Sequence, residues 1–313
     1  MTDIKRFDLI TIGNYTKDTI VTRAGTRHVH GGGFNYAARA AAAAGLSVAA
    51  VTRLAEEDRE MVGQMEAAGV TVFPRWTDTS TVMRLEYPTD NVDERILTVT
   101  TTAGSLEPDQ VADLEAPAFL VSPSIRGEVG IDVLNAIRRP GVLVGLDVQG
   151  YVRIRRDDGV LQHTQWPEIA ETLALVDVLK TDAVEAESLT GTADHEKAAR
   201  ILAEYGPREI VLTHREGLLV LADGQVYEQP FTPRELRGRS GRGDTCLGSY
   251  LTWRLQSDPG QAILWAAAAT SLKLEKEGPL TATRDEIAAA FEARGGVMPD
   301  RRTESAGPVG SIY

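Results

Sequence analysis

The chain has 313 residues, of which 42% are hydrophobic and 25% charged, ordinary values for a soluble globular protein. Its formal charge of −12 argues against a nucleic-acid-binding protein, which usually has a basic surface. Cys246 is the one cysteine, which excludes a disulfide framework and a cysteine-based metal cluster. No apolar run reaches membrane-spanning length and no apolar signal region precedes the first strand. We therefore expect a cytoplasmic protein that binds neither membrane nor nucleic acid.

Short apolar runs alternate with alanine-rich helical segments, the pattern of a parallel sheet wrapped by helices. Strands are expected at 9–12, 48–51, 119–121, 142–146, 176–179, 210–212 and 218–221. Helices are expected at 34–44, 59–68, 129–137, 166–175, 183–189, 195–205, 244–255, 259–274 and 284–293. Gly45, Gly69 and Gly206 stand where three of these helices should end. The pattern predicts an α/β fold.

Two segments interrupt the alternation. Residues 19–30 and 80–102 are rich in Thr, Val and Arg, alternate as strands do, and contain few helix formers. We expect them to form a small β lid over a substrate cleft, and the alternative is an edge hairpin without functional motion. No repeat or linker divides the chain, so a single domain over 1–313 is expected, with a loose tail at 294–313.

The most informative segment is Ser240-Gly241-Arg242-Gly243-Asp244-Thr245. Its glycines let successive backbone N–H groups point into one concavity, and the start of the expected helix adds unpaired N–H groups and a positive dipole end. Such a loop binds an anion. A carboxylate beside it is useful when it takes a proton from a group that then attacks the anion, so Asp244 is a candidate base for phosphoryl transfer. The alternative is that Asp244 only caps the helix.

Four arginines bracket this loop, namely Arg234, Arg237, Arg239 and Arg242. Positive charge concentrated at one place in an acidic protein suits a polyphosphate ligand. A solvated basic loop is an equally good interpretation of the same cluster.

Polar residues follow the first strand, in Gly13-Asn14-Tyr15-Thr16-Lys17-Asp18. Because open α/β sheets bind ligands beyond the carboxyl ends of their strands, Asn14 and Asp18 are candidates to hydrogen-bond a polyhydroxylated substrate, although a simple turn would use the same residues. Gly31-Gly32-Gly33-Phe34-Asn35 then precedes a helix, and its glycines allow close backbone approach while Asn35 offers a donor and an acceptor. Neither a dinucleotide fingerprint nor a Gly-Lys-Ser/Thr phosphate loop is present.

A carboxylate pair occurs in Lys180-Thr181-Asp182-Ala183-Val184-Glu185, between an expected strand and an expected helix. Asp182 and Glu185 are three residues apart, which puts them on one face, where they could hold Mg²⁺ through water molecules. The alternative is a capping box, in which the same two side chains satisfy the helix start. His28 and His30 have no visible third ligand, so we do not expect zinc.

In this order the segments resemble the ribokinase-like (PfkB) family of carbohydrate kinases. That family pairs a Gly-Gly-x-x-Asn segment with a later Gly-Ala-Gly-Asp loop, and Gly32-Gly33-Phe34-Asn35-Tyr36 and Gly241-Arg242-Gly243-Asp244 are similar to these. Glu94-Arg95 in the lid, the segment from Lys180 to Glu185, and Thr190-Gly191 agree with the family as well. The resemblance extends from about residue 9 to about residue 280.

The resemblance implies roles for particular residues. Asp244 would be the base, the N–H groups of Gly241, Arg242, Gly243 and Asp244 would hold the phosphoryl group, and Glu185 with Asp182 would place Mg²⁺. The implied substrate contacts are Asn14, Asp18, Gly32, Gly33 and Asn35. Thr213 and Gly217 would lie beside the nucleotide of ATP. Gly238-Arg239 departs from the usual Asp-Thr of the family, which puts a cation, Arg239, close to the phosphates.

Two local runs are similar to the inositol kinases of the family: Gly13-Asn14-Tyr15 with Asp18, and the run from Leu146 to Arg153, which places Gln149 and Arg153 near the site. They imply an ATP- and Mg²⁺-dependent kinase for a cyclitol or an aminocyclitol. A pentose, a hexose or a nucleoside remains open as the substrate. An idle regulator that binds sugar or nucleotide, motivated by Gly238-Arg239, and a dehydrogenase, disfavoured by the missing fingerprint, are the alternatives. A homodimer through the lid is also implied.

Overall fold

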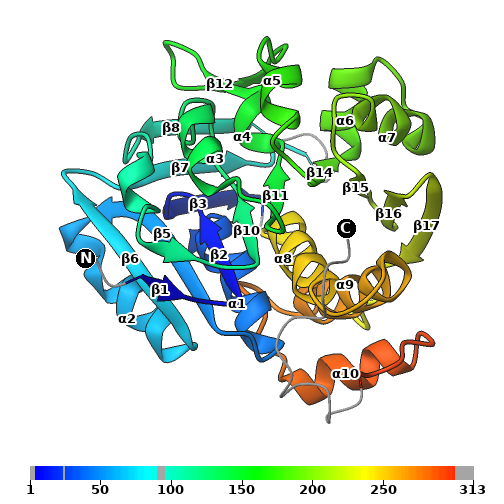
Figure 1. Ribbon diagram of the computed structural model, residues 1–313. Coiled ribbons are helices and arrows are strands. Elements are labelled where there is room, and N and C mark those ends of the chain that lie inside the picture. The colour runs from blue at the N-terminus through cyan, green and yellow to red at the C-terminus, as the bar shows by residue number, and fades with distance from the viewer. Residues whose placement is uncertain (1–3, 24, 90–95, 300–313) are drawn as a thin grey trace.

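A computed structural model describes residues 4–23, 25–89 and 96–299 of the chain. Its centre is a nine-stranded sheet with the strand order β17-β16-β15-β14-β11-β10-β2-β5-β6 (Figure 1). The strands are β2 (Leu9–Ile12), β5 (Val48–Ala55), β6 (Val70–Thr77), β10 (Ala118–Val121), β11 (Leu143–Asp147), β14 (Val178–Asp182), β15 (Glu209–Thr213), β16 (Gly217–Ala222) and β17 (Gln225–Pro230). Neighbours from β15 to β6 run parallel, while β16 and β17 are antiparallel. The predicted α/β fold with a mostly parallel sheet is confirmed.

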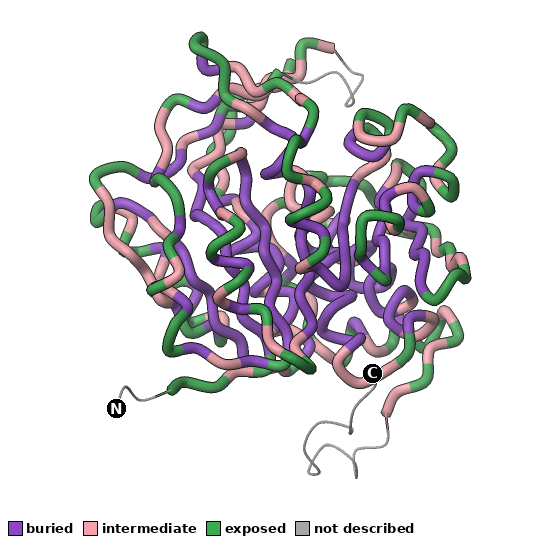
Figure 2. The backbone as a smooth tube through the Cα atoms, turned by 45° about the horizontal axis from the view of Figure 1, so that its top comes forward, coloured by how far each residue is buried: buried purple, intermediate pink, exposed green. Residues whose placement is uncertain are grey.

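Helices cover both faces of this sheet. One face packs against α1 (Gly33–Ala43), α2 (Arg59–Ala67), α8 (Arg242–Arg254), α9 (Pro259–Leu274) and α10 (Arg284–Glu292). The other packs against α3 (Ile131–Ile137), α5 (Ile169–Leu173), α6 (Ala183–Thr190) and α7 (His195–Ala203). Side chains alternate along each strand as the pleat requires, so Leu9 joins the first core and Ile10 the second. Figure 2 shows the resulting buried centre, with the exposed backbone at the periphery.

The helix α8 is held especially firmly, and this matters because it begins at the glycine loop. Every residue from Asp244 to Arg254 is buried. Small residues let its neighbours approach: a Cβ at Gly248 would lie 2.7 Å from the carbonyl oxygen of Ala37 in α1. On the α9 side, the rings of Trp253 and Trp265 stack with centroids 3.8 Å apart. The N-terminus of α8 is therefore a fixed point of the molecule.

The two segments that interrupt the α/β pattern meet in a second sheet, with the order β4-β3-β7-β8, which we call the lid sheet. Its strands are β3 (Thr16–Thr22), β4 (Gly25–Gly31), β7 (Thr81–Glu86) and β8 (Ile96–Thr101). β3 pairs in parallel with β7, which joins segments that are far apart in sequence. Glu94-Arg95 lies outside the described residues.

Several elements differ from the sequence predictions. β6 and β17 were not predicted, and α8 begins at Arg242 rather than at Asp244. Of the tail predicted to be loose, residues 294–299 are described, and there Arg294 donates to the carbonyl oxygen of Pro230 at 2.9 Å. The remaining small elements are β1 (Lys5–Arg6) with β9 (Leu114–Glu115), β12 (Arg153–Arg155) with β13 (Leu161–His163), α4 (Gln149–Val152), and the 3-10 turns at Glu56–Asp58 and Pro108–Gln110.

Candidate active site

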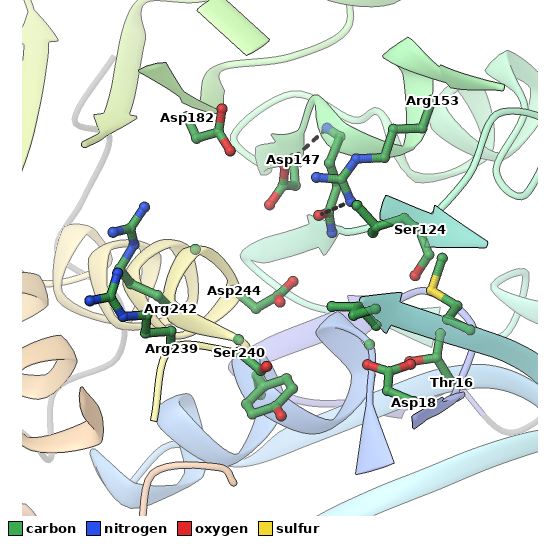
Figure 3. A pocket seen from close by; sticks show the side chains of 18 of the residues that line it. Thr16, Asp18, Ser124, Asp147, Arg153, Asp182, Arg239, Ser240, Arg242 and Asp244 are labelled. Carbon is green, nitrogen blue, oxygen red and sulfur yellow. Dashed lines mark hydrogen bonds between the residues drawn. The ribbon is translucent and has the colours of Figure 1, made fainter. Parts of the chain in front are cut away.

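A cavity lies where the carboxyl ends of β11, β14 and β15 meet the lid sheet and the start of α8. The predicted site residues that line it are Asp18, Gly32, Gln149, Arg153, Asp182, Thr213, Arg239, Gly241, Arg242, Gly243 and Asp244. Figure 3 shows Asp244 between Arg239 and Arg242 on one side and Thr16 and Asp18 on the other. This edge of a parallel sheet is where open α/β folds bind ligands. The cavity thus has two ends that meet at Asp244.

The glycine loop has the backbone geometry of the anion site that its sequence predicts. Gly241 is the N-cap of α8 and has φ 74°, a left-handed conformation that glycine adopts without strain. Thr245 donates to the carbonyl oxygen of Gly241 at 3.0 Å and so closes the first turn. The N–H groups of Gly243 and Asp244 precede this turn and have no partner within the helix. They are available to an anion at the positive end of the helix dipole.

The two glycine segments, more than 200 residues apart in sequence, are in contact. A Cβ at Gly241 would lie 2.2 Å from the ring of Tyr36, so only glycine fits between the loop and α1. Likewise, a Cβ at Gly33 would lie 3.1 Å from Oδ1 of Asp244. At both places the missing Cβ leaves room for side chains of other segments to lie against the backbone. The contact places the start of α1 against the candidate base.

A buried ion pair stands beside the anion site. Nζ of Lys180 lies 3.0 Å from Oδ2 of Asp147, at the ends of the adjacent strands β14 and β11. Burial alone would lower the pKa of Lys180, but nearby carboxylates, Asp147 foremost, more than offset this and hold it above its ordinary value. A Cβ at Gly243 would lie 2.6 Å from the ammonium, so this charge faces the anion loop. Lys180 was named in the sequence only as part of a family-like segment and was given no role, because a single lysine at the end of an expected strand carries no local signal.

The arginine cluster divides into two pairs. Arg239 and Arg242 line the cavity, whereas Arg234 pairs with Glu275 and Arg237 pairs with Glu235, both as exposed ion pairs. No hydrogen bond or ion pair of the Arg239 side chain is found within the described part of the chain. The solvated-loop interpretation therefore describes Arg234 and Arg237. Arg239 and Arg242 add positive charge to the end of the cavity where Thr213 and Asp182 also lie, so polyphosphate binding stays a prediction for these two.

The other end of the cavity carries acceptors and a lid wall. Burial, with a further contribution from the charge of Asp244, raises the pKa of Asp18 to about 7. Its Oδ1 is buried without a hydrogen-bond partner among the described residues, as is the Oδ1 of Asn14, which does not itself line the cavity. Met83, Leu85 and Leu97 of the lid sheet complete this end as an apolar wall that the sequence analysis did not predict. An unused acceptor opposite an apolar wall suits a small polyol.

The carboxylates of Asp182 and Glu185 do not form an open pair on one face. They make a capping box: Asp182 accepts from the amide of Glu185, and Glu185 accepts from the amide of Asp182, at 2.8 and 2.9 Å. Glu185 is 0% exposed and also accepts from Arg153 at 2.9 Å. Arg153 in turn donates to Gln149 at 2.9 Å. Asp182 reaches the cavity, whereas Glu185 stands behind it.

Five predicted site residues do not line the cavity, namely Asn14, Gly33, Asn35, Glu185 and Gly217. The Asn35 amide is used internally, donating to the carbonyl oxygen of His30 and accepting from Arg39, both at 2.8 Å. Gly217 packs on β17, where a Cβ would lie 2.2 Å from the carbonyl oxygen of Gln229. Asn35 and Gly217 therefore support the site without facing it.

Two further buried charges support the loops of the site. Glu128 accepts from the amides of Asn14 and Ser124 at 2.6 and 2.8 Å, and burial raises its pKa to about 7. Lys273 donates to the carbonyl oxygen of Gly238 at 2.8 Å, and burial lowers its pKa to about 8. Gly238 is needed there, since a Cβ would lie 2.0 Å from the carbonyl oxygen of Lys276. This close approach accounts for the glycine in the departure from Asp-Thr.

A candidate base at the start of a helix, beside a cavity with an unpartnered acceptor, is the arrangement expected of a phosphotransferase with an alcohol group as acceptor. The chain belongs to the pfkB family of carbohydrate kinases, whose family model matches residues 2–286. The expected ribokinase-like fold and kinase class are thereby confirmed. Within the described residues, no helix is long and apolar enough to span a membrane.

Similar proteins include kinases with different substrates and donors. A pyrophosphate-dependent kinase of the ribokinase family, solved with sulfate, is 30% identical, with a TM-score of 0.83 over 90% of this chain and 99% of that chain. One solved with a pyrophosphate analogue and myo-inositol is 29% identical, with a TM-score of 0.82 and the same coverage. A cytidine kinase of Thermococcus kodakarensis is 27% identical over 257 residues, which are 78% of this chain and 87% of that protein.

Proposed function

We propose that the protein transfers the terminal phosphoryl group of ATP to a hydroxyl of a cyclitol, such as myo-inositol or an aminocyclitol, with Mg²⁺. The observation that carries this proposal is the position of Asp244 between the glycine loop at the start of α8 and the unpartnered carboxylate oxygen of Asp18. The similarity to a kinase solved with myo-inositol supports the choice of a cyclitol. A sugar or a nucleoside is the alternative acceptor, and the similarity to a cytidine kinase supports the nucleoside.

The chemistry that follows is an in-line displacement. Asp18, which lines the cavity, accepts a hydrogen bond from the polyol and so orients it. Asp244 takes the proton of one hydroxyl, the hydroxyl oxygen bonds to the terminal phosphorus, and the bond from that phosphorus to the bridging oxygen breaks, its electrons leaving on ADP. The N–H groups of Gly243 and Asp244 and the ammonium of Lys180 stabilise the negative charge on the phosphoryl oxygens.

Among the predicted metal-binding residues, only Asp182 is placed to bind Mg²⁺ in the cavity. Mg²⁺ is usually held by one or two carboxylates together with substrate phosphates and water. Asp182 lines the cavity and fits this role, whereas Glu185 is enclosed by Arg153 and the helix start and supports Asp182 instead. Within the described residues there is no group of three or more His, Cys, Asp or Glu side chains placed to hold a metal. When bound, Mg²⁺ would neutralise part of the donor's charge.

Pyrophosphate is a second candidate donor, and the lining of the donor end favours it. Around the start of α8, most of the described residues that line the cavity are charged, polar or glycine, namely Lys180, Asp182, Thr213, Arg239, Ser240, Gly241, Arg242 and Gly243. Tyr36, which packs against Gly241, adds one aromatic ring to this end. Cations and N–H groups bind phosphates, but an adenine ring is usually held by apolar walls. Two of the similar kinases depend on pyrophosphate.

The test is an acceptor and donor panel. Phosphorylation of cyclitols, aminocyclitols, pentoses, hexoses and nucleosides is measured with ATP and, separately, with pyrophosphate. Turnover of a cyclitol with ATP supports the proposal in full. Turnover of a cyclitol with pyrophosphate but not with ATP would show that pyrophosphate is the phosphoryl donor. Exclusive turnover of a nucleoside or a sugar would overturn the cyclitol, and no turnover with any pair would overturn the function. Light scattering on the same sample tests the homodimer, which remains a prediction from the family resemblance.

A further inference from the structure

Ser122 makes the contact that holds the candidate base, although neither its sequence position nor the cavity lining points to it. It is the first residue after β10, and its hydroxyl donates to Oδ1 of Asp244 at 2.7 Å. Ser122 is 1% exposed and Asp244 is 9% exposed, so water competes little for this bond. Within the described residues it is the one hydrogen bond to the Asp244 carboxylate.

Two glycines make the space that Ser122 occupies. A Cβ at Gly33 would lie 2.3 Å from both Cβ and Oγ of Ser122, and a Cβ at Gly13 would lie 2.4 Å from its carbonyl oxygen. Gly33 has no positive φ and Gly13 has none either, so backbone conformation does not account for the glycines. The two glycines let three segments approach one another closely around Ser122. These segments are the end of β2, the start of α1 and the end of β10.

A carboxylate at the third position of a helix has other uses. From there a side chain can turn back toward the unpaired N–H groups of the first turn, as it does in a capping box. In α8 those N–H groups belong to the anion site, and an Asp244 that bonded them would block the donor and lose its reach to the acceptor. The bond from Ser122 holds Oδ1 on the side of β10 and leaves Oδ2 for the hydroxyl of the acceptor.

We propose that Ser122 is a positioning residue for phosphoryl transfer: its hydroxyl fixes the orientation of the Asp244 carboxylate, and Gly33 provides the space for this bond. The inference rests on the proposed role of Asp244 as the base. It extends that role, because it gives one glycine of the N-terminal segment a task in catalysis that is separate from binding the substrate.

The test compares Ser122→Ala, Ser249→Ala, Asp244→Asn and the double variant Ser122→Ala/Asp244→Asn. Ser249 is a buried serine further along α8, so its variant controls for the loss of a buried hydroxyl. We expect Ser122→Ala to lower kcat about 10- to 100-fold, since misplacement of a catalytic group costs this much, with both KM values and the melting temperature nearly unchanged. Ser249→Ala should keep the wild-type kcat. The double variant should be no slower than Asp244→Asn alone, because the two residues act as one unit.

Each other outcome overturns a defined part. A kcat of Ser122→Ala within twofold of wild type, or a raised KM with unchanged kcat, would refute the positioning role. If kcat of the double variant falls by the product of the factors measured for the two single variants, Ser122 acts independently of Asp244. These results leave the proposed function intact. By contrast, an inactive wild-type protein, or an Asp244→Asn variant with normal turnover, would refute both the function and the inference.

Discussion

Lys180 has a charged side chain of which only 5% is exposed. We expect it to stabilise the fold and also to assist phosphoryl transfer, and a single substitution would change both at once. Its ammonium neutralises Asp147 and faces the anion loop. Removing one partner of a buried pair leaves the other charge uncompensated, which costs about 3–5 kcal/mol. The structural task and the catalytic task therefore have to be separated by changing both partners.

We predict that Lys180→Met destabilises the fold and lowers kcat at least about 100-fold, since a cation at the transferred group is lost. The double variant Lys180→Met/Asp147→Asn should regain most of the stability, because no unpaired charge remains, but it should not regain activity. Urea unfolding and kcat of the three proteins check this. Recovery of activity in the double variant would show that Lys180 serves the fold alone.

Asp18, a proposed substrate contact, makes the stability of the fold depend on pH. Its pKa is about 7 in the folded protein and 3.8 in its ordinary state, chiefly because it is buried. A raised pKa means that Asp18 contributes stability that is fully present below about pH 4 and is lost as the pH rises through 7. The ionised carboxylate of Asp18 therefore destabilises the folded protein, because its buried Oδ1 has no hydrogen-bond partner among the described residues.

Asp18→Asn should therefore be more stable than wild type at pH 8, by about 2 kcal/mol. A pKa shift corresponds to about 1.4 kcal/mol per unit, and the smaller figure allows for relaxation of the structure around the charge. The difference should shrink toward pH 5. At the same time the KM for the acceptor should rise, because a carboxylate acceptor is lost. Urea unfolding at both pH values, together with acceptor kinetics, tests this; a variant less stable than wild type at pH 8 would contradict it.

At the scale of elements, α6 shows how a helix start and a ligand site can use one side chain. Asp182 caps α6 and also lines the cavity. Serine caps a helix about as well as aspartate, whereas alanine costs about 1 kcal/mol. The two substitutions thus separate capping from metal binding.

We predict that Asp182→Ser keeps the stability of wild type while Asp182→Ala loses about 1 kcal/mol. Both should need more Mg²⁺ for half-maximal activity, since both lack the carboxylate. Thermal unfolding and Mg²⁺ titrations of activity provide the comparison. An unchanged Mg²⁺ requirement in Asp182→Ser would leave Asp182 as a cap only.

The elements that sequence reasoning missed are those with weak local signals. β6 and β17 are the two edges of the central sheet, and β6 contains Pro74, which a strand pattern excludes from central positions. β17 is half-exposed and polar, so it lacks the apolar run of the inner strands. The start of α8 was predicted two residues late. A left-handed glycine, Gly241, caps the helix, and the Arg-Gly sequence that follows it is more typical of a loop.

At the scale of the whole molecule, the sequence predicted those parts of the site that unusual residues mark. Gly241, Gly243 and Asp244 form a dense local motif, and the structure places them at the cavity. Ser122 and Lys180 escaped prediction because their partners lie on other strands and helices; Ser122 and Asp244 are 122 positions apart. Asn35 was assigned to the substrate because its amide could serve either purpose, and only the packing shows that it is occupied.

The central claim is that Asp244 is the base of a polyol kinase, and one measurement tests it most directly. Phosphorus NMR follows wild type and Asp244→Asn with myo-inositol, Mg²⁺, and either ATP or pyrophosphate. We predict that wild type forms an inositol phosphomonoester with at least one donor, and that Asp244→Asn, with an unchanged melting temperature, forms it about 10²–10⁴-fold more slowly. Equal rates in the two proteins would contradict the role of Asp244, and no phosphomonoester from either donor would contradict the cyclitol kinase.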